Sequence, residues 1–269
     1  MVIRDTIFAD AVAAIDTGDV AKLDSLIAQH PQLVTDRLET QEPGYFADPY
    51  LLWFVAENPI RNHRLPANIV DVAMAIVDHI DGAGVSSRQA QIDYAVALVA
   101  TGMVPRECGV QLALIDALIA RGAQPAGLDS AVAHSETAAA LRLIHHGADL
   151  TLTAALCLGL DADARRLLPL ADTAARADAL VTTASQARAE AVRLLLAAGV
   201  DPNIRSARIH PHATALHQAA LTGDRETCEL LAAAGASLTT RDATWNGAPA
   251  GWAEHAGHHD LARLLRPAG

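Results

Sequence analysis

The stretch that decides the fold is Thr214-Ala-Leu-His-Gln-Ala-Ala-Leu-Thr-Gly223, which is followed by Asp224 and a second apolar run that ends at Gly235. Apolar residues at helical spacing predict one helix that ends at Gly223 and a second that begins after Asp224. The same register, a start residue followed nineteen positions later by glycine, occurs four times: Leu128 to Gly147, Leu180 to Gly199, Leu216 to Gly235 and Ala250 to Gly269. Repetition at a fixed spacing is the signature of a solenoid.

The opening of this unit nearly reproduces a known repeat motif. Residues 214–220 differ little from Thr-Pro-Leu-His-x-Ala-Ala, with which an ankyrin repeat begins, and the unit from Gly247 to Gly257 follows the same plan. Both units resemble the ankyrin repeat family. The resemblance implies an all-α fold of about seven or eight stacked helix-turn-helix units. It also implies that the chain binds another protein through a concave face built from inner helices and finger loops, and that His217 binds backbone groups in the turns.

We expect one ankyrin-repeat domain over residues 1–269. Its regions are an N-terminal cap unit (1–33), elongated units with insertions at 34–68 and 99–111 (34–124), shortened units (125–175), and regular units with a C-terminal cap (176–269). Gly147 and Gly199 are 52 residues apart, which fits two units whose finger loops have been trimmed. Helices are expected at 8–30 as a pair broken near Gly18, and at 69–80, 110–120, 151–158, 161–168, 176–186 and 190–198.

The elongated region carries a second resemblance. Together with Leu51-Leu-Trp-Phe-Val-Ala56, the insertions resemble a bacterial group of ankyrin proteins with elongated second and third repeats, for which no activity is established. Trp53 stands where histidine is usual in the repeat motif. This departure weakens any polar role that the resemblance would assign to position 53.

Composition limits the partners. The formal charge is −11, from 31 acidic and 20 basic side chains, so the chain offers no basic stripe for nucleic acid or for an anionic membrane. No run of 18 residues is free of charges, and the N-terminus does not read as a signal peptide. Three separated cysteines do not suggest a disulfide framework, and Cys228 is expected to be a small core residue. We expect a cytoplasmic protein.

Aromatic residues gather in the first insertion. Of nine aromatic side chains (three Trp, three Tyr and three Phe), five lie within ten residues: Tyr45, Phe46, Tyr50, Trp53 and Phe54. Such residues dominate interface hot spots, so Tyr45, Tyr50 and Trp53 are candidate partner contacts. Arg61, His63 and Arg64 would add polar contacts from the same insertion. The alternative is that a long insertion needs a small core of its own.

A second set of candidates lies near the C-terminal end. Trp252 and His255 are three residues apart and share a helix face, and Trp245 lies in the preceding finger near Arg241. The resemblance places such residues in the binding groove. The alternative is that they serve only to cap the terminal unit. If the chain is a binding module, Tyr45, Tyr50, Trp245 and Trp252 should be partly exposed.

The sequence indicates no cofactor and no metal site. Twelve histidines are present, but their spacings match neither a His-Glu-x-x-His motif nor a zinc finger. No serine lies in a Gly-x-Ser-x-Gly turn, and no glycine-rich phosphate loop is present. The main interpretation is therefore a non-catalytic protein-interaction module. The alternative is a small-molecule binding protein or enzyme whose pocket lies beneath the 34–68 and 99–111 insertions and uses Tyr45, His63, Arg64 and Glu107.

Overall fold

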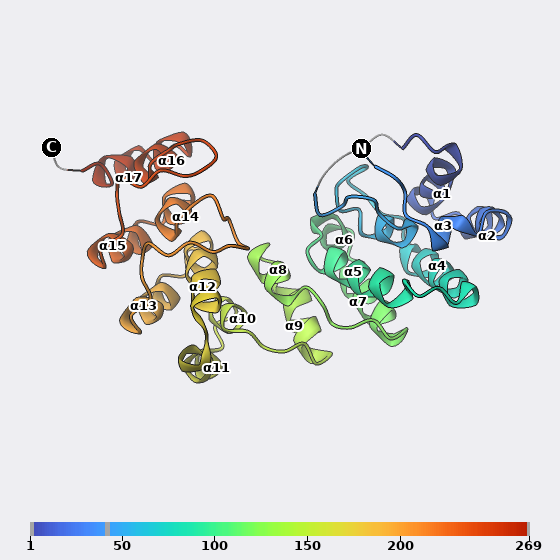
Figure 1. Ribbon diagram of the computed structural model, residues 1–269, viewed down its shortest axis with the longest axis horizontal. Coiled ribbons are helices and arrows are strands. Elements are labelled where there is room, and N and C mark those ends of the chain that lie inside the picture. Colours follow the sequence, from blue (N-terminus) through green and yellow to red (C-terminus); the bar gives the residue numbers. More distant parts are fainter. Residues whose placement is uncertain (1–2, 41–43, 268–269) are drawn as a thin grey trace. The chain divides into compact units, whose positions relative to one another are not determined.

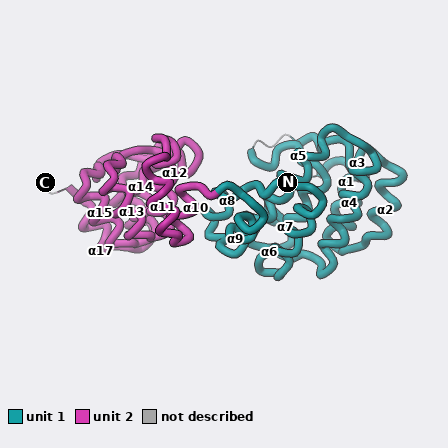
Figure 2. Tube along the Cα trace, turned by 90° about the horizontal axis from the view of Figure 1, so that it is seen from below, with its two compact units in different colours: residues 1–149 teal, residues 150–269 magenta. Residues whose placement is uncertain are grey.

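The computed structural model describes residues 3–40 and 44–267, and all regular structure in these ranges is helical. The chain divides into two compact units, residues 1–149 and 150–269, shown in two colours in Figure 2. Each unit is a stack of helix pairs in which an inner helix is followed by an outer one (Figure 1). The all-α expectation is confirmed, and each helix pair corresponds to one repeat.

Unit 1 contains four pairs. The inner elements, which pack against one another in the order given, are α1 (Thr6–Thr17), the 3-10 helix η1 (Leu51–Ala56), α5 (Arg88–Ala100) and α8 (Leu128–Ala133). The outer helices, packed in the same order, are α2 (Val20–Gln29), α4 (Ile69–Ala83), α7 (Gln111–Ala120) and α9 (Thr137–His145). Two short helices, α3 (Gln32–Thr35) and α6 (Met103–Glu107), lie in the connections.

Unit 2 also contains four pairs. Its inner helices are α10 (Leu152–Cys157), α12 (Thr173–Ser185), α14 (Ala215–Thr222) and α16 (Pro249–His255), and each packs on the next. The outer helices are α11 (Asp161–Leu167), α13 (Ala189–Ala197), α15 (Arg225–Ala233) and α17 (His259–Leu264), with the 3-10 turn η2 (Leu168–Leu170) after α11. The described residues thus hold eight pairs, in agreement with the seven or eight expected.

The predicted helices agree with the observed ones to within a few residues at each end. The connections at 146–151 and 168–172 are short, as the trimmed spacing predicted, whereas 198–214 and 234–248 are long loops. We call these two loops the first finger (198–214) and the second finger (234–248). The expectation for 99–111 needs a correction, because much of this range is helical in α5 and α6.

Small side chains let the inner helices approach closely. Ala215, Ala219 and Ala220 of α14 are fully buried, as is Cys228 of α15. Burial, with a smaller contribution from the nearby Asp224 and Glu229 carboxylates, raises the pKa of Cys228 to about 12. Cys228 is therefore a neutral core residue, as the repeat register predicted.

One close contact in unit 1 can accept only glycine. Gly127 precedes α8 with a φ of +90°, and a Cβ built there would lie 2.9 Å from the Ala97 Cα and 3.0 Å from the Ala97 Cβ on α5. Gly147 has nearly the same backbone, with a φ of +93°, but a Cβ there would meet no atom within 4 Å. Substituting each glycine in turn therefore distinguishes the cost of the positive φ, which both share, from the cost of helix packing, which only Gly127 has.

We predict that Gly127→Ala lowers the free energy of unfolding of unit 1 by about 2–4 kcal/mol, because the strained φ and the overlap with Ala97 add. Gly147→Ala should cost only about 1 kcal/mol, because only the strained φ contributes. Urea unfolding followed by tryptophan fluorescence, in which Trp53 reports on unit 1, and by circular dichroism measures both changes. Equal losses for the two variants would contradict a packing role for Gly127.

Candidate protein-binding site

A buried carboxylate organises the second finger. Asp242 Oδ1 accepts the backbone N–H groups of Thr244 at 2.8 Å and Trp245 at 2.6 Å. Its Oδ2 accepts the N–H of Gly247 at 2.7 Å and the indole N–H of Trp252 at 3.0 Å. Burial alone would raise the pKa of Asp242, but these four hydrogen bonds outweigh it and hold the pKa well below its usual range. Asp242 is therefore ionised, and it joins the finger to α16.

His217 connects this finger to the preceding repeat. Its Nδ1 accepts the backbone N–H of Thr214 at 3.3 Å and lies 2.8 Å from the Thr214 hydroxyl. Its Nε2 lies 3.2 Å from the carbonyl oxygen of Gly247, which can only accept, so the ring proton is on Nε2. Burial lowers the pKa of His217, although the Gly247 carbonyl and the Asp242 charge oppose the shift. The ring is neutral and binds backbone groups in the turns, as expected.

Three aromatic rings pack together beside this link. The ring centroids of Trp245 and Trp252 are 5.4 Å apart, and His212 of the first finger lies 5.3 Å from Trp245 and 5.8 Å from Trp252. Trp252 also makes an edge contact with His217 at 5.3 Å. The two fingers and α16 thus share one aromatic cluster.

A cavity of about 580 Å³ opens beside the cluster, and we call it the C-terminal cavity. Its lining residues come from the two fingers, α14 and α16: His210, His212, Gln218, Leu221, Trp245, Gly247, Gly251, Trp252 and His255. A Cβ at Gly251 would meet no atom within 4 Å, so this glycine faces open space. Trp245 is 68% exposed, and Leu221 is 40% exposed. The cavity is mainly apolar and is of the size that holds small ligands or a few side chains.

One family model and two known proteins match parts of the chain. The ankyrin repeat model matches residues 212–243, which contain the first-described motif. Cyclin-dependent kinase inhibitor 2A of Homo sapiens is 36% identical over 122 residues, in an alignment that covers 34% of this chain and 78% of that protein. The chain belongs to the ankyrin repeat family. Cyclin-dependent kinase 4 inhibitor B of Bos taurus is 35% identical over 117 residues, which cover 32% of this chain and 88% of that protein.

Ankyrin repeats together with these relatives identify the chain as a protein–protein interaction module. In the described ranges, no three His, Cys, Asp or Glu side chains come close enough together to hold a metal ion. A search of the same ranges finds no helix with the length and apolar character needed to cross a bilayer. Cys108 is exposed and Cys228 is buried, and neither forms a disulfide.

The aromatic residues of the first insertion mostly form its own core within the ankyrin scaffold. Phe46 contacts Phe54 and Trp53, with ring centroids 5.2 Å and 6.3 Å apart, and all three are buried. Tyr50 packs on Trp53 at 5.4 Å, and the Arg37 guanidinium lies 4.7 Å from the centre of the Tyr50 ring. These contacts support the small-core interpretation of this insertion.

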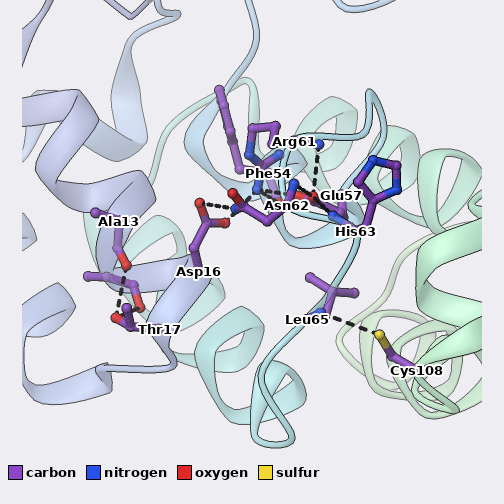
Figure 3. A network of polar contacts seen from close by, with 11 residues as sticks. Ala13, Asp16, Thr17, Phe54, Glu57, Arg61, Asn62, His63, Leu65 and Cys108 are labelled. Carbon is purple, nitrogen blue, oxygen red and sulfur yellow. Dashed lines mark hydrogen bonds and ion pairs between the residues drawn. The ribbon is translucent and has the colours of Figure 1, made fainter.

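The polar residues of the insertion are divided between internal and exposed positions. Figure 3 shows Arg61 between Asp16 of α1 and Glu57, with ion-pair distances of 2.7 Å and 2.9 Å. Arg61 also donates to the carbonyl oxygen of Phe54 at 3.0 Å, and the buried Glu57 accepts the N–H groups of Arg61, Asn62 and His63. The Arg61 guanidinium is thus engaged inside unit 1. His63 and Arg64 are exposed.

Trp53 keeps a polar contact at the histidine position of the ankyrin motif. Its indole N–H donates to the carbonyl oxygen of Gln91 on α5 at 3.1 Å, just as His217 donates to Gly247 of the following repeat. The expectation that tryptophan weakens a polar role at position 53 is therefore wrong. The indole N–H replaces the imidazole N–H as the donor to the next repeat.

The expected partial exposure is confirmed for Tyr45, which is 60% exposed, and for Trp245. It is wrong for Tyr50 and Trp252, each 8% exposed. Trp53 and Arg37 cover Tyr50, and the Asp242 carboxylate, which accepts the indole N–H, holds Trp252 inside the fold. His255 and Arg241 are exposed, and His255 lines the C-terminal cavity.

Sequence reasoning missed Asp242, Leu221 and Gly251 as parts of this site. Asp242 has no acidic counterpart one repeat earlier, where Arg208 stands, so the repeat pattern gave no signal for it. An aspartate at the start of a short segment that ends in Asn-Gly, as in Asp242-Ala-Thr-Trp-Asn-Gly247, is typical of a side-chain-capped turn and could have indicated its role.

We predict that Asp242→Asn destabilises unit 2 by about 3 kcal/mol, because the amide cannot accept four N–H groups and places its own donors against two of them. Urea unfolding followed by tryptophan fluorescence measures the loss. Asp260→Asn on the exposed surface of α17 is the matched control and should change stability by no more than about 0.5 kcal/mol. Similar losses for both variants would contradict the organising role of Asp242.

We predict that His217 makes unit 2 less stable in mild acid. The pKa of His217 is lowered on folding, so the unfolded chain binds the proton more tightly, and stability falls as the pH drops below about 6.5. The slope contributed by one such group approaches about 1.4 kcal/mol per pH unit. The measurement compares urea unfolding of the wild type and His217→Gln over this pH range. A wild-type slope that the substitution leaves unchanged would assign the acid sensitivity to other histidines.

Proposed function

We propose that the protein binds its partner through the concave side of unit 2, with the C-terminal cavity as the central contact. The observation that carries the proposal is a largely exposed Trp245 at the edge of an apolar cavity of about 580 Å³. An exposed tryptophan beside an apolar cavity is a typical interface hot spot, because covering it removes a large area from water. Asp242 and His217 support this function by fixing the finger before a partner arrives, which reduces the entropy lost on binding.

The named relatives support a protein as the partner. Both are described as inhibitors of cyclin-dependent kinases, and each aligns with about a third of this chain. Residues that all ankyrin repeats share, such as those of the 214–220 motif, mainly shape the scaffold. We therefore propose a protein partner without assigning it to the kinases.

The expectations about excluded partners, cellular location, origin and a small-molecule pocket remain predictions. The net charge of −11 supports a partner that is neither nucleic acid nor an anionic membrane. The expected cytoplasmic location and the resemblance to a bacterial group are supported by the sequence alone. A small-molecule pocket or enzyme at the insertions has less support, because Phe46, Trp53 and Phe54 fill the interior of the first insertion.

Contacts to a partner from Tyr45, Tyr50, Trp53, Arg61, His63 and Arg64 also remain predictions. Among these, the exposure of Tyr45, His63 and Arg64 supports a second contact surface on unit 1. Tyr50 and Trp53 could act only through the shape of the insertion, since they are buried.

The test is capture of partners by the immobilised full-length chain, followed by affinity measurement with each purified candidate. Trp245→Ala should weaken binding at least about tenfold, because it removes a hot-spot side chain, and should leave the thermal midpoint nearly unchanged. Trp252→Ala should instead lower stability by about 3–5 kcal/mol, because this indole is buried and hydrogen-bonded.

Gly251→Leu supplies a second variant, because it fills the cavity from a helix position where the added side chain meets open space. Leu170→Ala, an exposed apolar residue outside the cavity, is the matched control and should bind like the wild type. If every captured protein binds Trp245→Ala and Gly251→Leu as tightly as the wild type, unit 2 does not bind through this cavity.

A further inference from the structure

The fingers of unit 2 carry three arginines and two aspartates, in a protein that is acidic as a whole. Arg205 and Arg208 lie in the first finger and Arg241 in the second. Arg208 pairs with the buried Asp178 at 2.5 Å. Within the described residues, neither Arg205 nor Arg241 has a carboxylate within ion-pair distance, and their guanidinium groups donate to backbone carbonyl oxygens. Both guanidinium groups are therefore at the surface without a direct ion pair to any described carboxylate.

The two arginines lie beside the C-terminal cavity. Arg205 donates to the carbonyl oxygen of the cavity residue His212 at 3.4 Å, and to that of Arg241 at 3.0 Å. Arg241 donates at 2.6 Å to the carbonyl oxygen of Asn246, which is flanked by the cavity residues Trp245 and Gly247. These hydrogen bonds thus hold both guanidinium groups against backbone that either belongs to a lining residue or is directly bonded to one.

Within the part of the chain that the structure describes, the nearby carboxylates bond to groups other than the Arg205 and Arg241 guanidinium groups. Asp242 is buried under four N–H donors, and Asp178 accepts from Ser206 and Arg208. Glu254 of α16 pairs with Arg266 at 2.9 Å, and Asp201 accepts the N–H of Asn203 at the base of the first finger. The lining of the cavity itself contains no carboxylate among the residues that the structure describes. Arginines of the outer helices differ, since Arg193 and Arg225 pair with Glu226 and Glu229.

We infer that the partner is an acidic peptide segment that places an aromatic or long aliphatic side chain in the C-terminal cavity and carboxylates against Arg205 and Arg241. This inference rests on the proposed function and adds the chemistry of the partner. Apolar walls accept the side chain, and guanidinium groups bind carboxylates in a planar, two-point manner. Charge complementarity beside the cavity selects the acidic segment, contrary to the basic partner that the net charge of −11 alone would favour.

The experiment begins with a displayed library of random peptides, selected on the full-length wild type and, separately, on Gly251→Leu. Peptides recovered only on the wild type should contain a large apolar residue with Asp or Glu beside it. Synthetic peptides then keep the apolar residue and carry acidic, neutral amide or basic neighbours. Fluorescence polarisation measures their affinities. The acidic form should bind about tenfold more tightly than the neutral form, and the basic form should bind most weakly.

Variants of the arginines test the assignment. In Arg205→Gln combined with Arg241→Gln, the ratio of the affinities for the acidic and neutral peptides should fall to about one. Because the ratio is taken within one protein preparation, a partly unfolded variant does not alter it. Arg241→Lys keeps the charge and should retain part of the preference. Arg225→Gln on the outer helix α15 is the matched control and should keep the full ratio.

The outcomes separate this inference from the proposed function. Cavity-dependent peptides that are neutral or basic would overturn the acidic partner and leave binding through the cavity in place. A preference for acidic peptides that survives loss of both arginines would also overturn the inference. Recovery of the same peptides, or of none, on the wild type and on Gly251→Leu would count against the cavity and hence against both.

Discussion

Each repeat in this protein can bury its inner helix only against the neighbouring repeats, so every boundary must be completed by contacts across it. At several boundaries a buried side chain reaches from one repeat to the backbone of another. His217 donates to Gly247, Trp53 donates to Gln91, and the Gln91 amide donates to the carbonyl oxygen of Val34 at 3.0 Å. Apolar packing supplies most of the stabilisation, whereas these directional bonds set the register of one repeat on the next.

The proposed binding site depends on the same kind of contact. Asp242 holds the second finger against α16, and His217 holds it against α14, so three of the four elements that line the C-terminal cavity are mutually fixed. Trp245 then projects from a turn whose backbone N–H groups are already satisfied. A surface of this kind binds without first having to order its own loops, which favours affinity for a given contact area.

Much of the helical framework could be predicted from the sequence, because helix ends at Gly223 and the apolar spacing are local properties. The finger that carries Trp245 was also expected before the last inner helix. The site was predicted only in part. Trp245 is exposed as expected, and its role in binding stays a prediction, as does that of His255. The burial of Tyr50 and Trp252 depends on partners distant in sequence or on a turn geometry that periodicity does not show. Asp242 was missed because its role arises from the fold of one finger and has no counterpart in the preceding repeat.

The distribution of thiols has a practical consequence for studying the two units. Cys108 in unit 1 is exposed, and its sulfur accepts the N–H of Leu65 at 3.4 Å, whereas Cys157 and Cys228 in unit 2 are buried. An alkylating reagent applied to the native protein therefore marks unit 1 first, and later labels report the opening of unit 2. Mass spectrometry of a timed alkylation can thus follow the local opening of unit 2 without any engineered probe.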